Sequence, residues 1–498
     1  MSERLRDLFI FEMANNHQGS VEHGVRIIDA MGKIARKHDV RGAMKFQFRN
    51  LDTFIHPAAA NDPDAPHVGR FQQTRLDEDD FAAMIESVRA EGMIPVATPF
   101  DEDSVGTCLD LGIDIIKVAS CSATDWPLLE VVADAQKPII VSTGGATMDD
   151  IDNVVSFLEH KEVEFAILHC VAAYPAPRSA LQLDFISRMG KRYPNVPIGY
   201  SGHESPTDID AVKIAVSKGA TILERHVGVA TEEITLNAYS LDPEQAEAWV
   251  ASALEAKELC GSGTQKRVLQ EEIDSLRALA RGVYAARDVK QGEELTRDDV
   301  YYAMPCGPGQ LTSGEFGRYC TSWAASRDYQ RDEGVTELPQ PDPLNRVRSV
   351  LHDAKGMLYE AQIALGDRFE IEVSHHYGME KIRQFGAIIV NVLNREYCKK
   401  LVIVLPGQRH PDHHHKVKEE TFHLLWGDLT VQLDGVEHSM VPGDTLLIER
   451  NAQHAFTSRT GAVVEEISTT HRRGDSYYEE PDIARLDPME RKTVIDTW

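Results

Sequence analysis

The sequence predicts an α/β protein built on a (β/α)8 barrel, followed by a small β-rich module and an all-β barrel. The chain of 498 residues is too long for one hydrophobic core. Its first half alternates apolar runs with amphipathic stretches, and its last part carries short strands of alternating pattern. We therefore expect three domains, at residues 1–265, 280–335 and 346–480.

Eight apolar runs in the first half have strand length and are nearly continuous in hydrophobicity, as strands buried on both faces require. Amphipathic helical stretches such as 21–38 and 76–92 separate them. The runs span residues 8–14, 42–48, 93–100, 114–120, 138–144, 165–170, 197–203 and 220–227. A doubly wound open sheet is the alternative. Nearly every run ends in polar side chains, which a barrel gathers around one mouth, so the barrel is favoured.

The rest of the chain changes character. Residues 262–281 predict a polar helix that leaves the barrel, and 281–316 predict short strands around a tight turn. Residues 331–346 are charged and rich in proline, as a linker is. From about 348 to 470, short alternating strands predict an all-β barrel or sandwich.

The net charge of −27 argues against a nucleic-acid partner. No apolar stretch is long enough for a membrane span, and the N-terminus lacks the apolar region of a signal peptide. We therefore expect a cytoplasmic protein without a membrane partner. An anionic substrate would need a locally basic pocket, which directs attention to lysines at strand ends.

Lys45 and Lys117 lie near the ends of the second and fourth runs, inside apolar segments. A buried lysine needs an anionic partner or loses its proton. Hydroxyl groups at other run ends suit a phosphate and a carboxylate on one small molecule. These are Thr98, Ser120, Ser142 and Ser201. The alternative pairs each lysine with an internal carboxylate, Glu12 or Glu224, and residue types alone leave both interpretations open.

His203 and His226 end the seventh and eighth runs, which are neighbours in a barrel. Two imidazoles with a nearby carboxylate, Glu12 or Glu224, suit a divalent cation with open positions. Such an ion polarises an aldehyde oxygen.

Eight motifs of the first half occur in the order found in the sialic acid synthases, so residues 8–260 resemble that family. The motifs are FEMANNHQGS, MKFQF, VATPFDEDSV, LGIDIIKVAS, PIIVSTGGAT, LHCVAAYPAP, IGYSGH and ILERHV. Residues 281–320 resemble the antifreeze-like (SAF) domain of the same family. That domain closes the partner subunit's site in relatives, which implies a homodimer.

The resemblance implies a transferase that condenses phosphoenolpyruvate with an open-chain sugar aldehyde, giving a 2-keto-3-deoxy sugar acid and phosphate. C3 of phosphoenolpyruvate attacks the aldehyde carbon, whose oxygen binds Mn²⁺, Mg²⁺ or Co²⁺. By motif, Lys45, Thr98, Lys117, Ser120, Ser142 and Ser201 would bind phosphoenolpyruvate, and His203 and His226 the metal. Glu12, Gln47, Tyr174 and Glu224 would face the aldehyde and the reacting carbons.

Three departures from the family concern the sugar. Ala172 replaces a polar residue, and Leu236 and Asn237 stand where relatives often carry an acidic residue and a histidine. The loop 304–312 (MPCGPGQLT) lacks the arginine that reaches the partner's sugar in relatives. We therefore expect an aldose or modified amino sugar other than N-acetylmannosamine.

Residues 407–427 (GQRHPDHHHKVKEETFHLLWG) and 441–456 (VPGDTLLIERNAQHAF) fit the cupin pattern. A metal (Zn, Fe, Mn or Ni) would lie inside a small β-barrel, held by His413, His415, Glu420 and His454. The neighbouring His410, His414 and His423 are expected to point elsewhere. This module is compatible with a sugar isomerase or epimerase, a binding or oligomerisation module, or an oxygenase.

Two further hypotheses stay open for the barrel. One is an aldolase that uses Lys45 or Lys117 as a Schiff base. The other is a sugar sensor that keeps the barrel as a scaffold, which the complete set of polar strand-end residues disfavours.

Overall fold

The computed structural model describes residues 4–261, 266–316, 322–336, 343–366 and 369–495. The chain divides into two compact units, residues 1–266 and 267–498. Among the described residues, no helix combines the length and the apolar composition that a membrane crossing requires.

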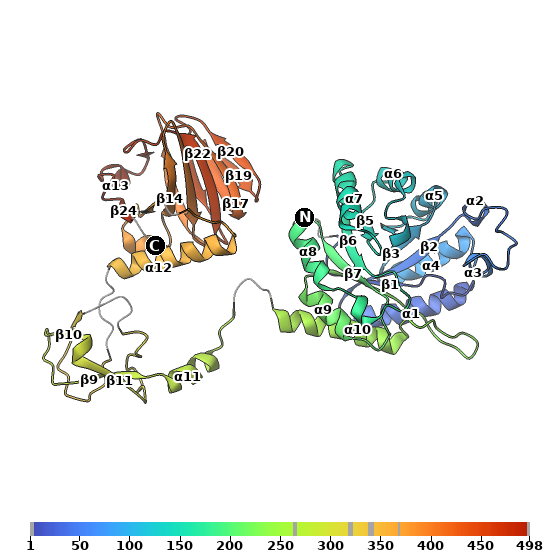
Figure 1. Cartoon of the computed structure of the whole chain (residues 1–498), viewed down its shortest axis with the longest axis horizontal. Helices are drawn as coiled ribbons and strands as arrows, with labels where there is room; N and C mark the ends of the chain where they lie inside the picture. The colour runs from blue at the N-terminus through green and yellow to red at the C-terminus, as the bar shows by residue number, and fades with distance from the viewer. Residues whose placement is uncertain (1–3, 262–265, 317–321, 337–342, 367–368, 496–498) are drawn as a thin grey trace. The chain divides into compact units, whose positions relative to one another are not determined.

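The first unit is a closed barrel of eight parallel strands in chain order, surrounded by helices (Figure 1). The strands are β1 (Leu8–Glu12), β2 (Arg41–Phe48), β3 (Ile94–Pro99), β4 (Ile115–Val118), β5 (Ile139–Ser142), β6 (Phe165–Cys170), β7 (Ile198–Gly202) and β8 (Ile222–His226). The predicted (β/α)8 barrel is confirmed. β8 pairs with β1, which closes the barrel and excludes the open sheet.

The helices that follow the strands pack around the barrel. They are α1 (Val21–Lys37), α4 (Glu78–Ala90), α5 (Glu102–Asp110), α6 (Trp126–Asp134), α7 (Met148–His160), α8 (Asp184–Arg192), α9 (Asp210–Ser217) and α10 (Pro243–Cys260). Capping boxes begin three of these helices: Asp77 with Asp80, Thr147 with Asp150, and Asp242 with Gln245. Two short helices, α2 (Leu51–Phe54) and α3 (Val68–Gln73), interrupt the connection from β2 to α4.

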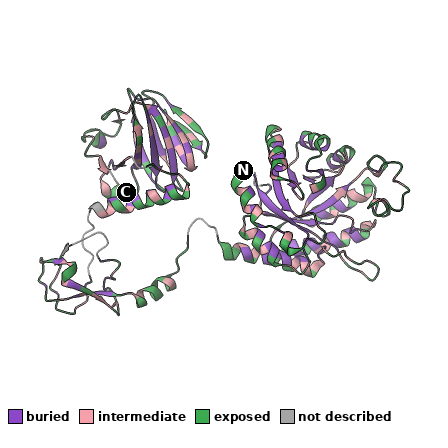
Figure 2. Ribbon diagram, viewed as in Figure 1, coloured by how far each residue is buried: buried purple, intermediate pink, exposed green. Residues whose placement is uncertain are grey.

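Side-chain alternation divides most of the barrel strands between two cores, and most strand residues are therefore buried (Figure 2). Leu8, Ile10, Ala43, Val96 and Ile115 belong to a small core inside the barrel. Phe9, Phe11 and their equivalents pack outward against the helices. Alternation has a period of two residues, so the side chains two positions after these inner apolar residues also point inward. They are Glu12, Lys45, Thr98 and Lys117.

The second unit begins with α11 (Gln270–Leu279) and a small module around its own apolar core. The module contains β9 (Gly282–Ala285), β10 (Glu294–Thr296), β11 (Val300–Ala303) and β12 (Ser322–Ala324), paired as β9 with β11 and β10 with β12. Part of the predicted helix 262–281, residues 262–265, lies outside the described residues. The antifreeze-like identity of this module stays a prediction.

The chain then forms α12 (Pro343–Glu360) and two antiparallel sheets. The seven-stranded sheet runs β20 (Thr445–Ile448), β17 (Glu420–Gly427), β22 (Ala462–Thr469), β15 (Tyr397–Val404), β14 (Ala387–Asn394), β13 (Glu370–Ser374), β24 (Lys492–Ile495). The five-stranded sheet runs β19 (Val436–Met440), β18 (Leu429–Leu433), β21 (His454–Thr457), β16 (Arg409–His414), β23 (Tyr477–Tyr478). The short helix α13 (Pro481–Ala484) lies between β23 and β24 in the sequence. The predicted all-β architecture is confirmed.

Two features of this module differ from the sequence prediction. The segment predicted as a linker up to residue 346 becomes helical at Pro343, because Val347, Val350, Leu351 and Ala354 repeat at helical spacing and are buried in one core. The sheet also extends past residue 480, because β24 pairs with β13.

Candidate functional site

The carboxyl ends of the barrel strands surround a cavity of about 900 Å³. Most of its polar lining residues were predicted from the strand ends. The predicted residues that line it are Glu12, Lys45, Gln47, Thr98, Lys117, Ser120, Ser142, Tyr174, Ser201, His203, Glu224 and His226. The structure thus brings all the barrel residues proposed from the sequence as site residues into one cavity. This is expected, because the carboxyl ends of the strands in a closed barrel surround one mouth.

Lys45 lies between two buried carboxylates. Its Nζ forms ion pairs with Glu12 and, at 2.8 Å, with Glu224 Oε2. Strand pairing explains this, since Lys45 lies beside Glu12 in the β1–β2 register and β8 borders β1 on its other side. Burial lowers the pKa of Lys45 to about 8, although Glu224 opposes the shift. For Lys45, the internal-pairing alternative is the one that the structure supports.

Glu224 is held as a carboxylate. Burial by itself would raise its pKa, but Lys117 and Lys45 and a hydrogen bond keep that pKa well below its usual range. The hydrogen bond comes from Ser201 Oγ, which donates to Glu224 Oε1 at 2.7 Å. Ser201 therefore orients this carboxylate and is not free as a donor to a substrate.

Lys117 has a different environment from Lys45. Its ammonium is 1% exposed and donates to Ser142 Oγ at 2.6 Å and to the carbonyl of Val118 at 3.0 Å. Both acceptors are uncharged, and no described carboxylate lies within ion-pair distance. The buried hydroxyl of Thr98 has no hydrogen-bond partner among the described residues. A buried cation and an unused donor at one cavity suit an anionic ligand.

The two barrel histidines have rings 5.3 Å apart between centroids. His203 Nδ1 lies 3.2 Å from the carbonyl of Val171, and because a carbonyl only accepts, this nitrogen carries the proton and Nε2 has the lone pair. The buried Nδ1 of His226 has no hydrogen-bond partner among the described residues. Burial lowers the pKa of His203 to about 4 and that of His226 well below its usual value. Two neutral imidazoles with unused nitrogens fit two ligands of a divalent ion.

Other side chains of the cavity were not singled out in the sequence. Arg49 lies with its guanidinium carbon 3.7 Å from the Phe100 ring centre and 4.1 Å from that of Phe71, and it donates to Gln47 Oε1 at 2.9 Å. Arg70 and Tyr239 also line the cavity. Arg49 directly follows β2, so a charged residue just after a strand was the signal that could have found it. Arg70 lies on α3, which no strand pattern predicts.

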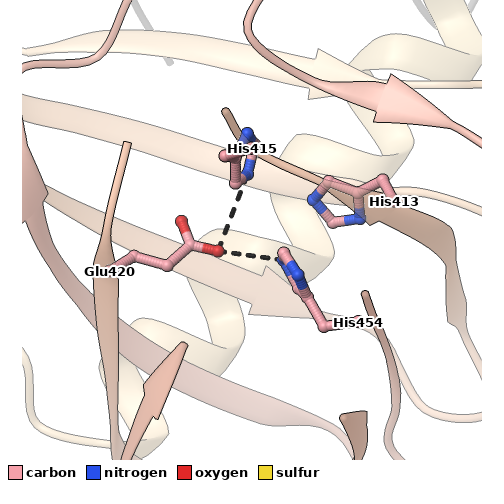
Figure 3. Close-up of side chains that lie close together, drawn as sticks. All are labelled: His413, His415, Glu420 and His454. Carbon is pink, nitrogen blue, oxygen red and sulfur yellow. Dashed lines mark ion pairs between the residues drawn. The ribbon is translucent and has the colours of Figure 1, made fainter. Parts of the chain in front are cut away.

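The β module holds the second predicted site. His413, His415, Glu420 and His454 are buried and bring one ligand atom each within 4.8 Å of one another. Figure 3 shows the carboxylate of Glu420 directed at two of the rings. Glu420 Oε1 is 2.9 Å from His454 Nε2 and 3.6 Å from His415 Nε2. Among the described residues, this is the one group of three or more His, Cys, Asp or Glu side chains that is compact enough to hold a metal ion.

The hydrogen bonds behind these histidines support metal binding. The Nδ1 atoms of His413, His415 and His454 lie 3.1, 2.5 and 3.1 Å from backbone carbonyls. Each Nδ1 therefore carries the proton and each Nε2 has a lone pair, the arrangement of metal-ligating histidines. Lys418 forms an ion pair with Glu420 Oε2, which leaves Oε1 for the cluster. The four residues fit a metal ion.

One prediction for this region was wrong. His410 was expected to point away from the site, but it is buried, lines the same cavity, and its ring centre is 4.7 Å from that of His413. The cause is an irregularity in β16, where the pairing with β21 shifts between His410 and His413 and places both on one face. His423 is outside this cavity and pairs with Glu465 at 3.3 Å, as expected for a residue that points elsewhere.

The chain matches the NeuB family over residues 34–265 and a cupin domain over residues 400–470. A crystal structure from Chromobacterium violaceum ATCC 12472, described as a spore coat polysaccharide biosynthesis protein E, is 44% identical; the match covers 68% of this chain and 100% of that one, with a TM-score of 0.66. Human N-acetylneuraminate-9-phosphate synthase is 28% identical over 58% of this chain and 80% of its own length. N,N'-diacetyllegionaminic acid synthase of Legionella pneumophila is 26% identical over 59% of this chain and 85% of its own. These matches and the barrel together show that the chain belongs to the NeuB family and carries a cupin domain near its C-terminus.

Proposed function

We propose that the barrel condenses phosphoenolpyruvate with an open-chain sugar aldehyde and releases phosphate and a 2-keto-3-deoxy sugar acid. The observation that carries this proposal is the buried Lys117 ammonium. Within the described chain it donates hydrogen bonds only to uncharged oxygens, and the Thr98 hydroxyl of the same cavity has no partner there. An enolpyruvyl phosphate supplies the missing negative charge and acceptors. The relatives named as sugar acid synthases support the class of product.

The phosphoenolpyruvate site would use donors from adjacent strands. Lys117 and Ser142 already share a hydrogen bond, and Ser120 Oγ accepts from the backbone N–H of Gly144 at 3.0 Å, which holds the β5 loop beside them. We assign these residues, with Thr98, to the phosphate and carboxylate of the substrate, and because Lys45 is paired with Glu12 and Glu224 we place it at the reacting carbons. Preorganised charges in a dry cavity stabilise developing charge more than solvent does.

The reacting carbons would lie near Glu12, Glu224 and Lys45. When C3 attacks the aldehyde carbon, the aldehyde oxygen gains a proton, and the water that adds at C2 loses one. Lys45, whose pKa is lowered to about 8, is suited to deliver a proton, and one of its two carboxylates is suited to accept one. Gln47 and Tyr174 line the same cavity and are assigned to hold the aldehyde.

A divalent ion, Mn²⁺, Mg²⁺ or Co²⁺, would be held by His203 and His226 and would act as a Lewis acid on the aldehyde. The unused nitrogens of these rings support this assignment. Tyr174 packs against His203 and Tyr239 against His226, with ring centres 4.5 and 5.0 Å apart. These aromatic rings would fix the imidazoles and shield them from solvent.

The sugar side of the cavity supports an aldose other than N-acetylmannosamine. Ala172, Leu236 and Asn237 line it. The side-chain oxygen of Asn237 is used within its own loop, where it accepts from the backbone N–H groups of Tyr239 and Ser240 at 3.1 and 2.8 Å. Arg49 and Arg70, contributed by the same barrel, supply positive charge at the cavity. Homodimerisation and a cytoplasmic location remain part of this proposal.

A phosphate-release assay tests the proposal. Metal-loaded protein, phosphoenolpyruvate and Mn²⁺ are mixed with a panel of aldoses and N-acylated amino sugars, and phosphate release should depend on one class of them. Product mass should equal the sum of the aldose and pyruvate. Folded, metal-loaded protein that releases no phosphate with any aldehyde would rule the proposal out.

The Schiff-base aldolase is distinguished in the same preparation. A Schiff base needs a neutral amine, whereas Lys45 is paired with two carboxylates. Borohydride treatment with pyruvate should therefore leave the mass of the protein unchanged. A trapped pyruvyl adduct on Lys45 or Lys117 would favour the aldolase instead.

A further inference from the structure

The cupin metal cluster opens on a cavity of about 80 Å³ with an unusually charged lining. Four basic side chains line it: Lys400, Lys418, Arg491 and Lys492. Three carboxylates line it as well: Glu372, Glu420 and Glu466. A bound divalent ion would add two positive charges to this small space.

Each of the three carboxylates already forms an ion pair with a lysine of the lining. Lys492 pairs with Glu372 at 3.0 Å, and Lys418 pairs with Glu420 and, at 2.9 Å, with Glu466. Lys400 is left 3.6 Å from Glu466, a carboxylate that Lys418 already binds, and 3.3 Å from His471 Nδ1. The lining therefore has fewer carboxylates than cations, even without a metal.

Arg491 is the clearest unmatched cation. Its side chain forms no hydrogen bond or ion pair within the described ranges, and its guanidinium carbon lies 4.8 Å from the centre of the Tyr478 ring. Tyr478 stacks on His413, with ring centres 5.3 Å apart and an interplanar angle of 17°. Its hydroxyl also lies 2.7 Å from His376 Nε2. One aromatic ring thus connects the unpaired guanidinium with the metal cluster.

Arg491 and Tyr478 lie outside the matched cupin domain, which ends at residue 470. They nevertheless line the cupin cavity, because β23 pairs with β16 and β24 pairs with β13. The C-terminal segment thus contributes a basic and an aromatic side chain to the cavity. Lys400 and Lys418 are buried and share the buried carboxylates of Glu420 and Glu466, whereas Arg491 is half-buried and has no carboxylate partner among the described residues. A partly desolvated guanidinium without a carboxylate favours an anionic ligand.

We propose that this cavity binds a small carboxylate with an oxygen on the neighbouring carbon, a 2-keto or 2-hydroxy acid. His413, His415, Glu420 and His454 would hold the ion, and such an acid would offer it a carboxylate oxygen together with the neighbouring keto or hydroxyl oxygen. Arg491 and Lys400 would neutralise the carboxylate, since charge-assisted hydrogen bonds favour this pairing.

The size of the cavity agrees with this ligand class. At roughly 10–15 Å³ for each water-sized group, the cavity holds about six such groups, enough for the acid end of a small molecule. The proposal is independent of the barrel reaction. If the proposed barrel reaction is right, however, its product carries this 2-keto acid group.

The test uses the full chain with the barrel site disabled by Lys117→Met and His226→Ala. This protein is loaded with Co²⁺, whose visible absorption reports on ligands at the cupin cluster, and titrated with pyruvate and separately with its neutral methyl ester. Isothermal titration calorimetry gives the Kd in parallel. We expect a saturable spectral change with pyruvate and binding at least about tenfold weaker for the ester.

Arg491→Gln should weaken pyruvate binding roughly 10- to 100-fold, the loss of one charge-assisted contact. Lys400→Met is a second variant should the first fold poorly. Arg485→Gln is the matched control, because Arg485 is exposed and does not line the cavity, and it should stay within about twofold. Absence of a spectral change, equal binding of the ester, or unchanged Kd in folded Arg491→Gln and Lys400→Met would each overturn the proposal.

Discussion

Replacing Lys45 by Met tests whether one ammonium really holds two buried carboxylates in the barrel. Glu12 and Glu224 are 1% and 4% exposed, and both pair with Lys45. Without Lys45, two buried carboxylates remain close together, and one of them takes up a proton. Removing one partner of a buried ion pair costs about 3–5 kcal/mol in general.

The loss of stability in Lys45→Met can be bounded by the free energy needed to protonate one glutamate. A glutamate ordinarily titrates near pH ~4.3, so keeping one protonated at pH 7 costs about 3.7 kcal/mol, and about 1 kcal/mol at pH 5, at ~1.36 kcal/mol per unit. In the variant the folded-state pKa is raised, so the folded form is favoured at low pH and loses stability as pH rises. The destabilisation should therefore grow from about 1 kcal/mol at pH 5 to about 3–4 kcal/mol at pH 7.

Hydrogen exchange of the amides in β1 and β2 measures the free energy of unfolding of the barrel, because buried strands exchange through opening of the whole barrel. The matched control is Lys257→Met, which removes a pair with Asp7 at 2.6 Å on the surface. It should cost at most about 1 kcal/mol at either pH. A Lys45→Met protein whose barrel loses less than about 1 kcal/mol at pH 7, or the same amount at both pH values, would refute the reasoning.

Three further predictions follow from single contacts. Lys117→Met should lower kcat/KM for phosphoenolpyruvate at least about 100-fold in the phosphate-release assay, while Lys218→Met, at a surface pair with Asp184, should not change it. His413→Ala should lower the metal content by one ion per chain, measured by elemental analysis after dialysis, with barrel activity retained; unchanged metal content would contradict the cupin site. Glu204→Gln should destabilise the barrel by about 3–5 kcal/mol in the same exchange experiment, because fully buried Arg225 loses its carboxylate; a loss as small as that of surface Glu255→Gln would argue against it.

Much of the barrel and its site followed from the local pattern. Strands buried on both faces need continuous apolar runs, and the polar residues that end them, from Glu12 to His226, favoured a shared barrel mouth over the edge of an open sheet. The cupin ligands were equally local, since His413, His415 and Glu420 lie within eight residues of one another. Such features depend on spacing along the chain, and spacing is what a sequence displays directly.

Electrostatic pairing was not local. Lys45 and Lys117 both lie near strand ends inside apolar segments, yet among the described residues only Lys45 of the two forms ion pairs with carboxylates. Strand register places Glu12 beside Lys45, and closure of β8 against β1 brings Glu224 near. His410 lines the cupin cavity because the pairing of β16 is irregular between His410 and His413, and the alternating pattern of the sequence does not reveal this irregularity.

The sequence by itself determined which residues could do chemistry and at which strand ends they stand, because periodicity and composition set local structure and burial. The tertiary structure alone decided which charges meet. Arg491 reaches the cupin cavity from a C-terminal segment about 70 residues beyond the cupin ligands His413, His415 and Glu420, through pairing of β24 with β13. Coulombic interactions depend on distance in space, and only a closed barrel and paired sheets bring distant residues within that distance.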